Sequence, residues 1–418
     1  MKGGNVQGLK GKQVLISMLA LICVLFIILG LRRAHVSNVL FASSNNWQHF
    51  HVLQQLAVTN ADVEAGHLHK RTECDYFKGK WVLDNGRRPL YSGNSCRRFL
   101  SAMWACRLTT RPDFQFEKYK WQPDDCTLPP FDSHSFLTKM RNKTIAFVGD
   151  SLGRQQFQSL MCLITGGTES IVADDVGREF GFDLRPPFSV RPGGWAYLFQ
   201  LTNTRVVFSW SSWLGDVQVD NESDPFSSSA LQLDQPASFL RDYVHKLDVL
   251  VLNTGHHWNR GKLLGNRIEM HANGSKELSK KLQVLRNAYN YTVQNVVKFM
   301  NNQIDHNPGL RVFLTTLSPR HFRNGDWDSG GSCDNIKPFG DPTNSKFLKD
   351  PVAEAAISNT KVQLLNITYL SQFRGEAHIS KYSITGRNGT EDCLHWCLPG
   401  IPDVWNEILH AKLIEDRI

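Results

Sequence analysis

The chain has 418 residues, of which 41% are hydrophobic and 21% charged, and a formal net charge of +8. A chain of this length and composition can bury one large core or two smaller ones, which excludes wholesale disorder. Five of the Lys and Arg residues and none of the acidic ones lie in residues 1–33, so the remainder has a net charge of only +3. This balance argues against nucleic acid as a partner.

The first predicted element is a membrane span. Residues 14–31 carry no charged side chain, and eighteen apolar residues suffice for a helix to cross a bilayer. Arg32 and Arg33 stand where a signal peptide would have its small-residue cleavage site, so the sequence predicts an uncleaved signal anchor after a cytosolic tail, residues 1–13. Residues 32–71 are polar with scattered histidines, and we expect a lumenal stem rather than a metal site.

Cysteines and glycosylation sequons place the rest of the chain in an oxidising lumen. Cys23 lies in the predicted span, which leaves an even eight cysteines: Cys74, Cys96, Cys106, Cys126, Cys162, Cys333, Cys393 and Cys397. The Asn-x-Ser/Thr sequons all follow the span, at Asn142, Asn221, Asn273, Asn290, Asn366 and Asn388. We therefore expect disulfides, N-glycosylation and a large lumenal part.

The lumenal part begins with a cysteine-rich segment, residues 72–131. It holds four of the cysteines, many turn residues and little helical periodicity. This composition predicts a small disulfide-rich module.

An α/β domain is predicted over residues 132–418. Short aliphatic and β-branched runs recur at residues 144–150, 205–210, 248–254, 311–318 and 361–368. Runs that are apolar on both faces indicate buried parallel strands. Helical segments lie between them, the clearest being residues 276–304, where apolar side chains recur at steps of three and four. The pattern predicts a three-layer domain with a central parallel sheet.

A serine stands at the end of the first of these strands. In TIAFVGDSLGRQQFQSL the strand ends at Gly149, and a helical pattern begins directly after Ser151. The carboxyl edge of a parallel sheet is where ligand sites usually lie, and the Ser151 N–H at a helix N-terminus can help stabilise an oxyanion. The alternative is that Asp150 or Ser151 only caps the helix.

A second group of reactive side chains lies near the carboxyl terminus, in DCLHWCLPGIPDVWN, residues 392–406. A serine nucleophile needs a base, and the base needs an orienting carboxylate, which Asp392 and His395 offer three residues apart. The alternative is a metal site built from His395 with Cys333, Cys393 and Cys397, but this needs free thiolates. In an oxidising lumen we expect no metal.

The GDSL start, the Asp-x-x-His string and the preceding cysteine-rich segment resemble the plant trichome birefringence-like family, over residues 72–418. The acyl-esterase-like domain of that family is similar to SGNH hydrolases. The resemblance implies a single-pass type II Golgi membrane protein that transfers acetyl groups onto hydroxyls of cell-wall polysaccharides. It implies Ser151 as nucleophile, His395 as base and Asp392 as its orienter. Many relatives read GDSLxRN, whereas Gln155 follows Arg154 here.

Several polar residues near the same edge of the sheet are weaker candidates. Asn253, in VLNTGHHW, matches the block that supplies an oxyanion-hole amide in SGNH hydrolases, although a turn-capping asparagine has the same pattern. Arg154 is expected to orient an acyl or sugar oxygen, unless it lies on the helix surface. His256 and His257 follow Asn253, and either could instead hydrogen-bond locally.

Four indoles and a long loop are further candidates for an acceptor site. The indoles of Trp213, Trp258, Trp396 and Trp405 could stack on sugar faces, although core packing is the more ordinary role. Residues 319–344 are rich in Gly and Asp, as loops beside active sites often are.

Among the many pairings open to eight cysteines, we expect Cys333 to pair with Cys393 and Cys106 with Cys397. These pairs would fix the Asp-x-x-His turn against the long loop and the cysteine-rich segment.

Three functions compete. The first is an O-acetyltransferase working through an acyl-serine, and the second is an acetylesterase using the same residues. The third is a non-catalytic protein that binds and bridges wall polysaccharides such as pectin. The acceptor would be xylan, mannan, xyloglucan or pectin. We expect no bound cofactor, because no glycine-rich loop suits coenzyme A; an acetyl donor is required, and a separate membrane protein would supply it.

Overall fold

The computed structural model describes residues 74–415, except 169, 183–192, 222, 225, 277, 335–336, 339–348 and 385–389. The expected cytosolic tail, membrane span and stem therefore lie outside the described residues. Within the described part, no helix has both the length and the apolar character needed to cross a membrane.

A seven-stranded sheet in the order β12-β11-β9-β3-β6-β5-β4 lies at the centre of the fold. Its five parallel strands fall within or next to the five predicted runs: β3 (Thr144–Gly149), β6 (Thr204–Trp210), β9 (Val249–Leu252), β11 (Arg311–Thr315) and β12 (Gln363–Leu365). Two antiparallel strands, β5 (Gly194–Phe199) and β4 (Asp174–Asp175), extend the sheet and were not expected. Strand β5 was missed although its sequence, GWAYLF, is itself an apolar run of strand length.

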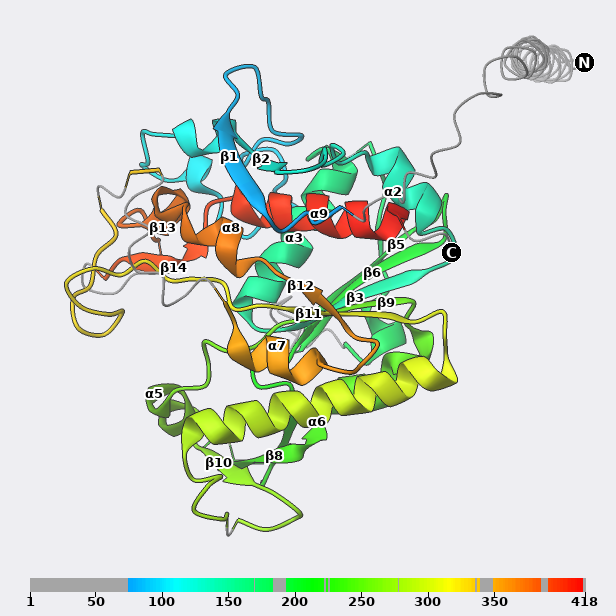
Figure 1. Ribbon diagram of the computed structural model, residues 1–418, viewed down its shortest axis with the longest axis vertical. Helices are drawn as coiled ribbons and strands as arrows, with labels where there is room; N and C mark the ends of the chain where they lie inside the picture. The colour runs from blue at the N-terminus through cyan, green and yellow to red at the C-terminus, as the bar shows by residue number, and fades with distance from the viewer. Residues whose placement is uncertain are drawn as a thin grey trace, which may run out of the picture. The chain divides into compact units, whose positions relative to one another are not determined.

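Alternate side chains of β3 face two different hydrophobic clusters, as the pleat of a strand requires. Ile145 and Phe147 join the cluster of α3 (Ser151–Thr165) and α9 (Ile401–Glu415). Ala146 and Val148 join the cluster on the opposite face, which includes residues of three other helices: α4 (Ser238–Tyr243), α6 (Leu285–His306) and α7 (Pro351–Ile357). Figure 1 shows α3 and α9 on one side of the sheet and α6 and α7 on the other. The predicted mixed α/β domain with a central sheet is confirmed.

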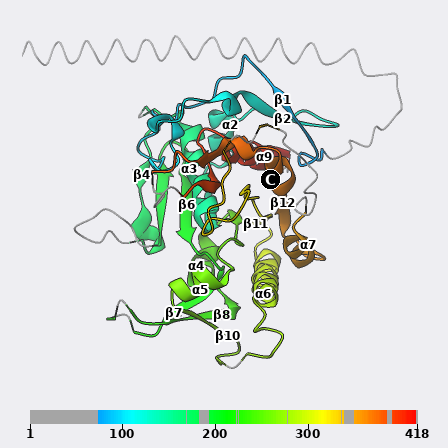
Figure 2. The same ribbon diagram turned by 90° about the vertical axis from the view of Figure 1, so that its left-hand side faces the viewer.

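A smaller sheet packs beyond α6, with strand order β10-β8-β7 (Figure 2). Its strands are β7 (Gly215–Val219), β8 (Ser229–Pro236) and β10 (Ile268–His271), and α5 (Arg260–Gly265) precedes β10. The helix predicted from residue 276 is wrong over its first nine residues, because α6 begins only at Leu285. Leu278 and Leu282 instead pack on a third hydrophobic cluster with residues of β8. Their helical spacing therefore reflects packing on this cluster and not a helix.

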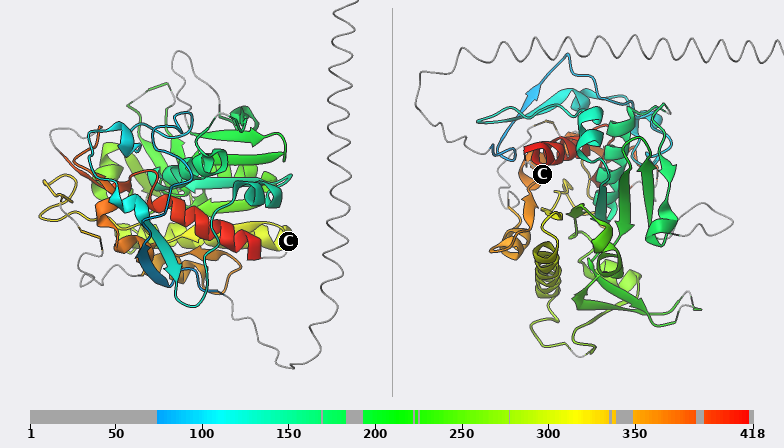
Figure 3. Two further views of the ribbon diagram at one scale, coloured as in Figure 1. Left: turned by 90° about the horizontal axis from the view of Figure 1, so that it is seen from above. Right: turned by 90° about the vertical axis from the view of Figure 1, so that its right-hand side faces the viewer.

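The amino-terminal segment packs against the α/β domain, and from Cys74 onward the chain forms one compact unit. Its two-stranded antiparallel sheet, β1 (Gly79–Leu83) with β2 (Tyr119–Pro123), lies beside α9 (Figure 3). Only one of its disulfides, Cys74–Cys126, is internal. Two more leave the segment, Cys96–Cys162 to α3 and Cys106–Cys397 to the loop before α9.

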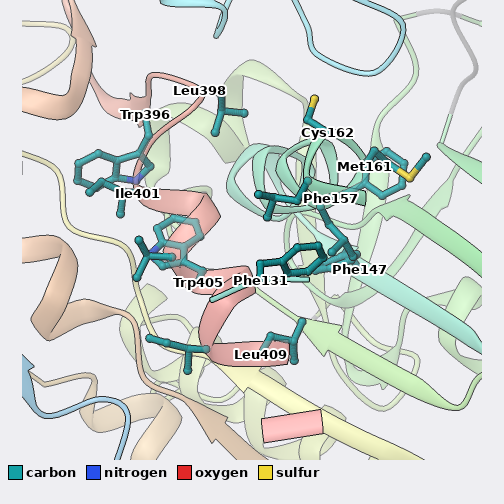
Figure 4. Close-up of a cluster of buried hydrophobic side chains, with 14 of the residues drawn as sticks. Phe131, Phe147, Phe157, Met161, Cys162, Trp396, Leu398, Ile401, Trp405 and Leu409 are labelled. Atoms are coloured by element: carbon teal, nitrogen blue, oxygen red, sulfur yellow. The ribbon is translucent and has the colours of Figure 1, made fainter. Parts of the chain in front are cut away.

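The four indoles considered for sugar stacking belong to hydrophobic clusters, with exposed fractions of 9% or less. Trp396 and Trp405 meet edge to face in the largest cluster, and Figure 4 shows Phe157 and Met161 on the other side of that cluster. Trp213 and Trp258 help form the third cluster. Because their faces are covered by protein, these indoles pack the core rather than bind sugar.

Candidate active site

The loop between β3 and α3 presents Ser151 at the carboxyl edge of the central sheet. Asp150, which is 1% exposed, caps α3: its Oδ1 accepts a hydrogen bond from the Leu152 N–H at 2.9 Å. Because Asp150 is the cap, the Ser151 hydroxyl does not have to serve as one.

Ser151, His395 and Asp392 form a continuous hydrogen-bonded row. Ser151 Oγ lies 2.7 Å from His395 Nε2, and His395 Nδ1 lies 2.9 Å from Asp392 Oδ2. A carboxylate only accepts, so Nδ1 carries the hydrogen and Nε2 can accept the serine proton. The structure thus brings together the three residues expected to carry the chemistry, although they lie at opposite ends of the domain sequence.

Asp392 stays ionised in this row. Burial alone would raise its pKa, but the charge of His395 and hydrogen bonds from His395 and from the Leu394 N–H outweigh burial and lower the pKa to about 2. A negative carboxylate can stabilise the imidazolium that forms when His395 takes up a proton.

The strand that carries Asp392 and His395 is β14 (Asp392–Trp396), which pairs with β13 (His378–Ser380). Disulfides hold it near both ends, Cys333–Cys393 on one side and Cys106–Cys397 on the other. These are the two pairs expected from the sequence. Because the thiols are paired, none of them offers the thiolate that the alternative metal site requires.

Gln155 fastens this strand to α3. Its Nε2 donates to the Trp396 carbonyl at 2.7 Å, and its Oε1 accepts from the Trp396 N–H at 3.1 Å. Both residues are fully buried, so the backbone next to His395 has no water as an alternative partner. Sequence reasoning missed this role, and noted Gln155 only as a departure from GDSLxRN.

Asn253 contacts the turn that carries the serine. Its Nδ2 donates to Asp150 Oδ1 at 2.6 Å. Its Oδ1 occupies the space where a Cβ on Gly149 or Gly153 would lie, so both positions require glycine for this close approach. The observed contact is thus with the helix cap, and the oxyanion-hole role remains a prediction.

Arg154 lies in aromatic surroundings rather than on an open helix surface. Its guanidinium is 4.5 Å from the ring centre of Trp104, and that indole stacks on the His395 imidazole at 5.8 Å. The ring centres of Trp195 and Trp210 lie 5.9 and 6.0 Å from the guanidinium carbon. Burial lowers the pKa of Arg154. Trp104 comes from the amino-terminal segment, and no local pattern marks it as a neighbour of the base.

A pocket of about 380 Å³ opens beside Asp392 and His395. The described part of the 319–344 loop lines it through Arg320, Phe322 and the half-exposed Trp327, and Lys262 of α5 faces it as well. This loop therefore borders the triad, as expected.

The two histidines after Asn253 have local partners. His256 contributes to the same pocket, and its Nε2 bonds the Ser318 carbonyl at 2.7 Å. His257 packs edge-on against Trp210 and Trp213. Burial lowers the pKa of each histidine.

A second pocket, of about 330 Å³, lies between the β1–β2 sheet and α9. None of the three triad residues lines it. The pocket beside His395 is therefore the better candidate for a substrate.

We predict that Gln155→Leu destabilises the protein by roughly 2–5 kcal/mol, because it leaves a buried N–H and a buried carbonyl of Trp396 unpaired. Urea unfolding measures the change. Gln156→Leu is the matched control, since Gln156 is equally buried and its Nε2 has no partner among the described residues. Equal losses in the two variants would refute the fastening role of Gln155.

Comparison with known proteins agrees with this geometry. Residues 128–412 match the model of the GDSL/SGNH-like acyl-esterase family found in Pmr5 and Cas1p, and residues 72–127 match the PMR5 N-terminal domain.

Curated relatives align over most of the chain. Trichome birefringence-like proteins 14 and 15 of Arabidopsis thaliana are 48% and 45% identical, over 81% of this chain and 86% and 70% of their own lengths. A probable xylan O-acetyltransferase 9 of Oryza sativa subsp. japonica is 31% identical, over 82% of this chain and 78% of its own length. The chain therefore belongs to the GDSL/SGNH-like acyl-esterase family found in Pmr5 and Cas1p, among its trichome birefringence-like members.

Proposed function

We propose that the protein is an O-acetyltransferase that moves acetyl groups onto hydroxyls of plant cell-wall polysaccharides. The observation that carries the proposal is the hydrogen-bonded row of Ser151, His395 and Asp392 in a chain of an acyl-esterase family. The relative named a probable xylan O-acetyltransferase supports acetyl as the transferred group and a polysaccharide as the acceptor.

In the proposed first half-reaction, His395 Nε2 takes the proton of Ser151 Oγ while that oxygen attacks the acetyl carbonyl of the donor. The tetrahedral intermediate collapses when His395 returns the proton to the leaving group, which leaves acetyl-Ser151. In the second, His395 deprotonates a sugar hydroxyl, which attacks the acetyl-serine; the proton then passes to Ser151 Oγ. Asp392 holds His395 in the required tautomer throughout.

Two groups are proposed to stabilise the oxyanion of the intermediate. The Ser151 N–H belongs to the first turn of α3, where N–H groups lack intrahelical acceptors and the helix dipole favours negative charge. The second group is the Asn253 amide, provided that its N–H not bonded to Asp150 turns toward the serine.

The pocket beside His395 favours a sugar acceptor over water. Phe322 and Trp327 offer aromatic faces of the kind that stack on pyranose rings, and Asn259 and Lys262 add hydrogen-bond donors. An acceptor held there would compete with water for acetyl-Ser151, and this competition separates a transferase from an esterase.

We also propose a type II Golgi membrane protein with its catalytic domain in the lumen. The disulfides support this placement, and so do the sequons at Asn142, Asn221 and Asn273, whose side chains are exposed and can accept a glycan. Asn366 is different, because it is half-buried and accepts a hydrogen bond from Thr316. The remaining two sequons are less informative, since Asn290 lies half-buried on α6 and Asn388 lies outside the described residues. The acetyl donor would be delivered by a separate membrane protein.

The transfer proposal is tested by incubating the purified full chain with p-nitrophenyl acetate and oligosaccharides of xylan, mannan, xyloglucan and pectin. Mass spectrometry should find an acetylated oligosaccharide. Ser151→Ala and His395→Ala should each lower kcat by about 10⁶-fold, and Asp392→Asn by about 10⁴-fold because it only misorients the base.

Other outcomes of this assay would overturn the transfer proposal. Acetate release without an acetylated oligosaccharide would identify an esterase. Oligosaccharide binding without any turnover would identify a binding protein.

The topology is tested on protein from plant membranes. Endoglycosidase should increase its mobility on a gel, and peptide mapping should find glycans at exposed sequons such as Asn221 and Asn273 but not at Asn366. A carboxyl-terminal part that carries no glycan and is digested by protease outside sealed vesicles would invert the proposed orientation.

A further inference from the structure

Two imidazoles lie in a row behind the catalytic strand. His378 is fully buried and stacks on Trp396 with 3.8 Å between ring centres. Its Nδ1 lies 3.0 Å from the His395 backbone carbonyl oxygen, and its Nε2 lies 2.7 Å from Nδ1 of His321. His321 Nε2 in turn lies 2.9 Å from the Gln372 carbonyl oxygen. The row thus runs from one carbonyl through two rings to another carbonyl.

All three hydrogen bonds of the row can form only if the two rings together carry one proton more than two neutral imidazoles. Carbonyl oxygens only accept, so His378 Nδ1 and His321 Nε2 must each carry a hydrogen. The contact between the two rings needs a third hydrogen on one of the facing nitrogens. A neutral imidazole carries one hydrogen, so three hydrogens on two rings amount to a single positive charge.

The surroundings oppose positive charge on the pair, so a proton there depends on the three hydrogen bonds of the row. Burial is the main cause that lowers the pKa of each ring, and a charge on one ring would repel a charge on the other. Arg323 and His395 also lower these pKa values, whereas Asp392 and the hydrogen bonds to the two carbonyls raise them. Arg111, whose guanidinium donates to the His378 carbonyl, adds a further cation beside the pair.

The same residues hold the backbone of β14. His321 donates its own N–H to the Cys393 carbonyl at 3.0 Å, and His378 pairs with Trp396 across β13 and β14. With the side-chain bond to the His395 carbonyl, the pair contacts this strand at three successive places. Neither His321 nor His378 lines the pocket beside His395.

We propose that His321 and His378 share a single proton and act as positioning residues that hold His395 in line with Ser151. When the pair loses this proton, one of the three hydrogen bonds must break. Two lone pairs then face each other between the rings, or one carbonyl loses its donor. The His395 carbonyl is one end of the row, so deprotonation loosens the strand that carries the base.

This arrangement sets opposite requirements on two sites. His395 must be neutral to accept the Ser151 proton, so activity rises with pH as it loses its own proton. The pair must retain its proton, so activity falls as the pair becomes neutral. We therefore expect a bell-shaped profile of kcat, whose fall at alkaline pH disappears when the pair no longer has to hold a proton.

Variants at His378 separate this role from simple packing. In His378→Asn the amide nitrogen takes the place of Nδ1 and can still donate to the His395 carbonyl, but no shared proton remains. In His378→Leu the hydrogen bond to the His395 carbonyl and the shared proton are both lost. His321→Gln is a second conservative variant, because its amide nitrogen takes the place of Nε2 and can still donate to the Gln372 carbonyl.

The kinetic test measures p-nitrophenyl acetate hydrolysis by the full chain from acidic to alkaline pH, and it rests on the proposed acyl-serine chemistry. His378→Asn and His321→Gln should keep most of kcat and lose the alkaline limb. His378→Leu should lower kcat by about 100-fold with little change in KM, as expected when a base is misplaced by about 1 Å. An unchanged alkaline limb in the two conservative variants, or full kcat in His378→Leu, overturns the proposal.

Unfolding measured against pH gives a readout that does not depend on activity. Below the ordinary histidine pKa of about 6.5 the unfolded chain binds two protons at these residues, whereas the folded pair binds one. The double variant His378→Asn/His321→Gln binds no such proton in either state. Relative to that variant, the wild-type unfolding constant should rise about tenfold per pH unit of acidification, whereas two neutral rings would give about 100-fold. If this smaller rise is found but no ester is hydrolysed, the proposed function fails and the shared proton stands. If ester is hydrolysed and the wild-type unfolding constant rises about 100-fold per pH unit relative to the double variant, or does not rise, the shared proton is refuted.

Discussion

The arrangement depends on one hydrogen bond, 2.7 Å long, between Ser151 and His395, residues 244 positions apart in the chain. A helix start holds one partner and a short strand holds the other, and a shift of about 1 Å between them would cost catalysis heavily. Much of the surrounding structure resists such a shift. Gln155 ties the strand to the helix, two disulfides hold it near its ends, and the core between α3 and α9 fixes the distance that these bonds span.

The amino-terminal segment takes part in this arrangement rather than standing apart from it. Trp104 covers one face of the His395 imidazole and contacts Arg154, and Cys106 is bonded to Cys397 just beyond the catalytic strand. Arg111 reaches the carbonyl of His378. A base in contact with a buried indole is shielded from water on that side, which strengthens its hydrogen bonds to Ser151 and Asp392. The segment therefore contributes directly to the surroundings of the base.

Local patterns in the sequence were sufficient to predict those parts of the site whose residues lie close together in the chain. The turn at Ser151 follows from an apolar strand that meets a helical pattern. The spacing of Asp392 and His395 indicated their pairing, but the shared face of a helical turn was the wrong reason, because both residues lie on strand β14 and Asp392 also accepts from the His395 N–H. Gln155, Trp104 and His378 act through partners far along the chain, so no window of sequence indicates their roles. The same limit explains the start of α6, where Leu278 and Leu282 have helical spacing but pack against a neighbouring sheet. Strand β5 is a different case, because its sequence GWAYLF is a continuous apolar run and the local pattern for a strand was present but not used.

The central claim is that Ser151 carries the acetyl group. The most direct measurement incubates the full chain briefly with an isotopically labelled acetyl donor and no acceptor, then quenches, digests and maps the peptides by mass. The account predicts one labelled acetyl group on the peptide that contains Ser151, none in Ser151→Ala, and transfer of the label to an oligosaccharide added before the quench. Labelled oligosaccharide formed without any acetylated Ser151, or formed equally well by Ser151→Ala, would contradict it.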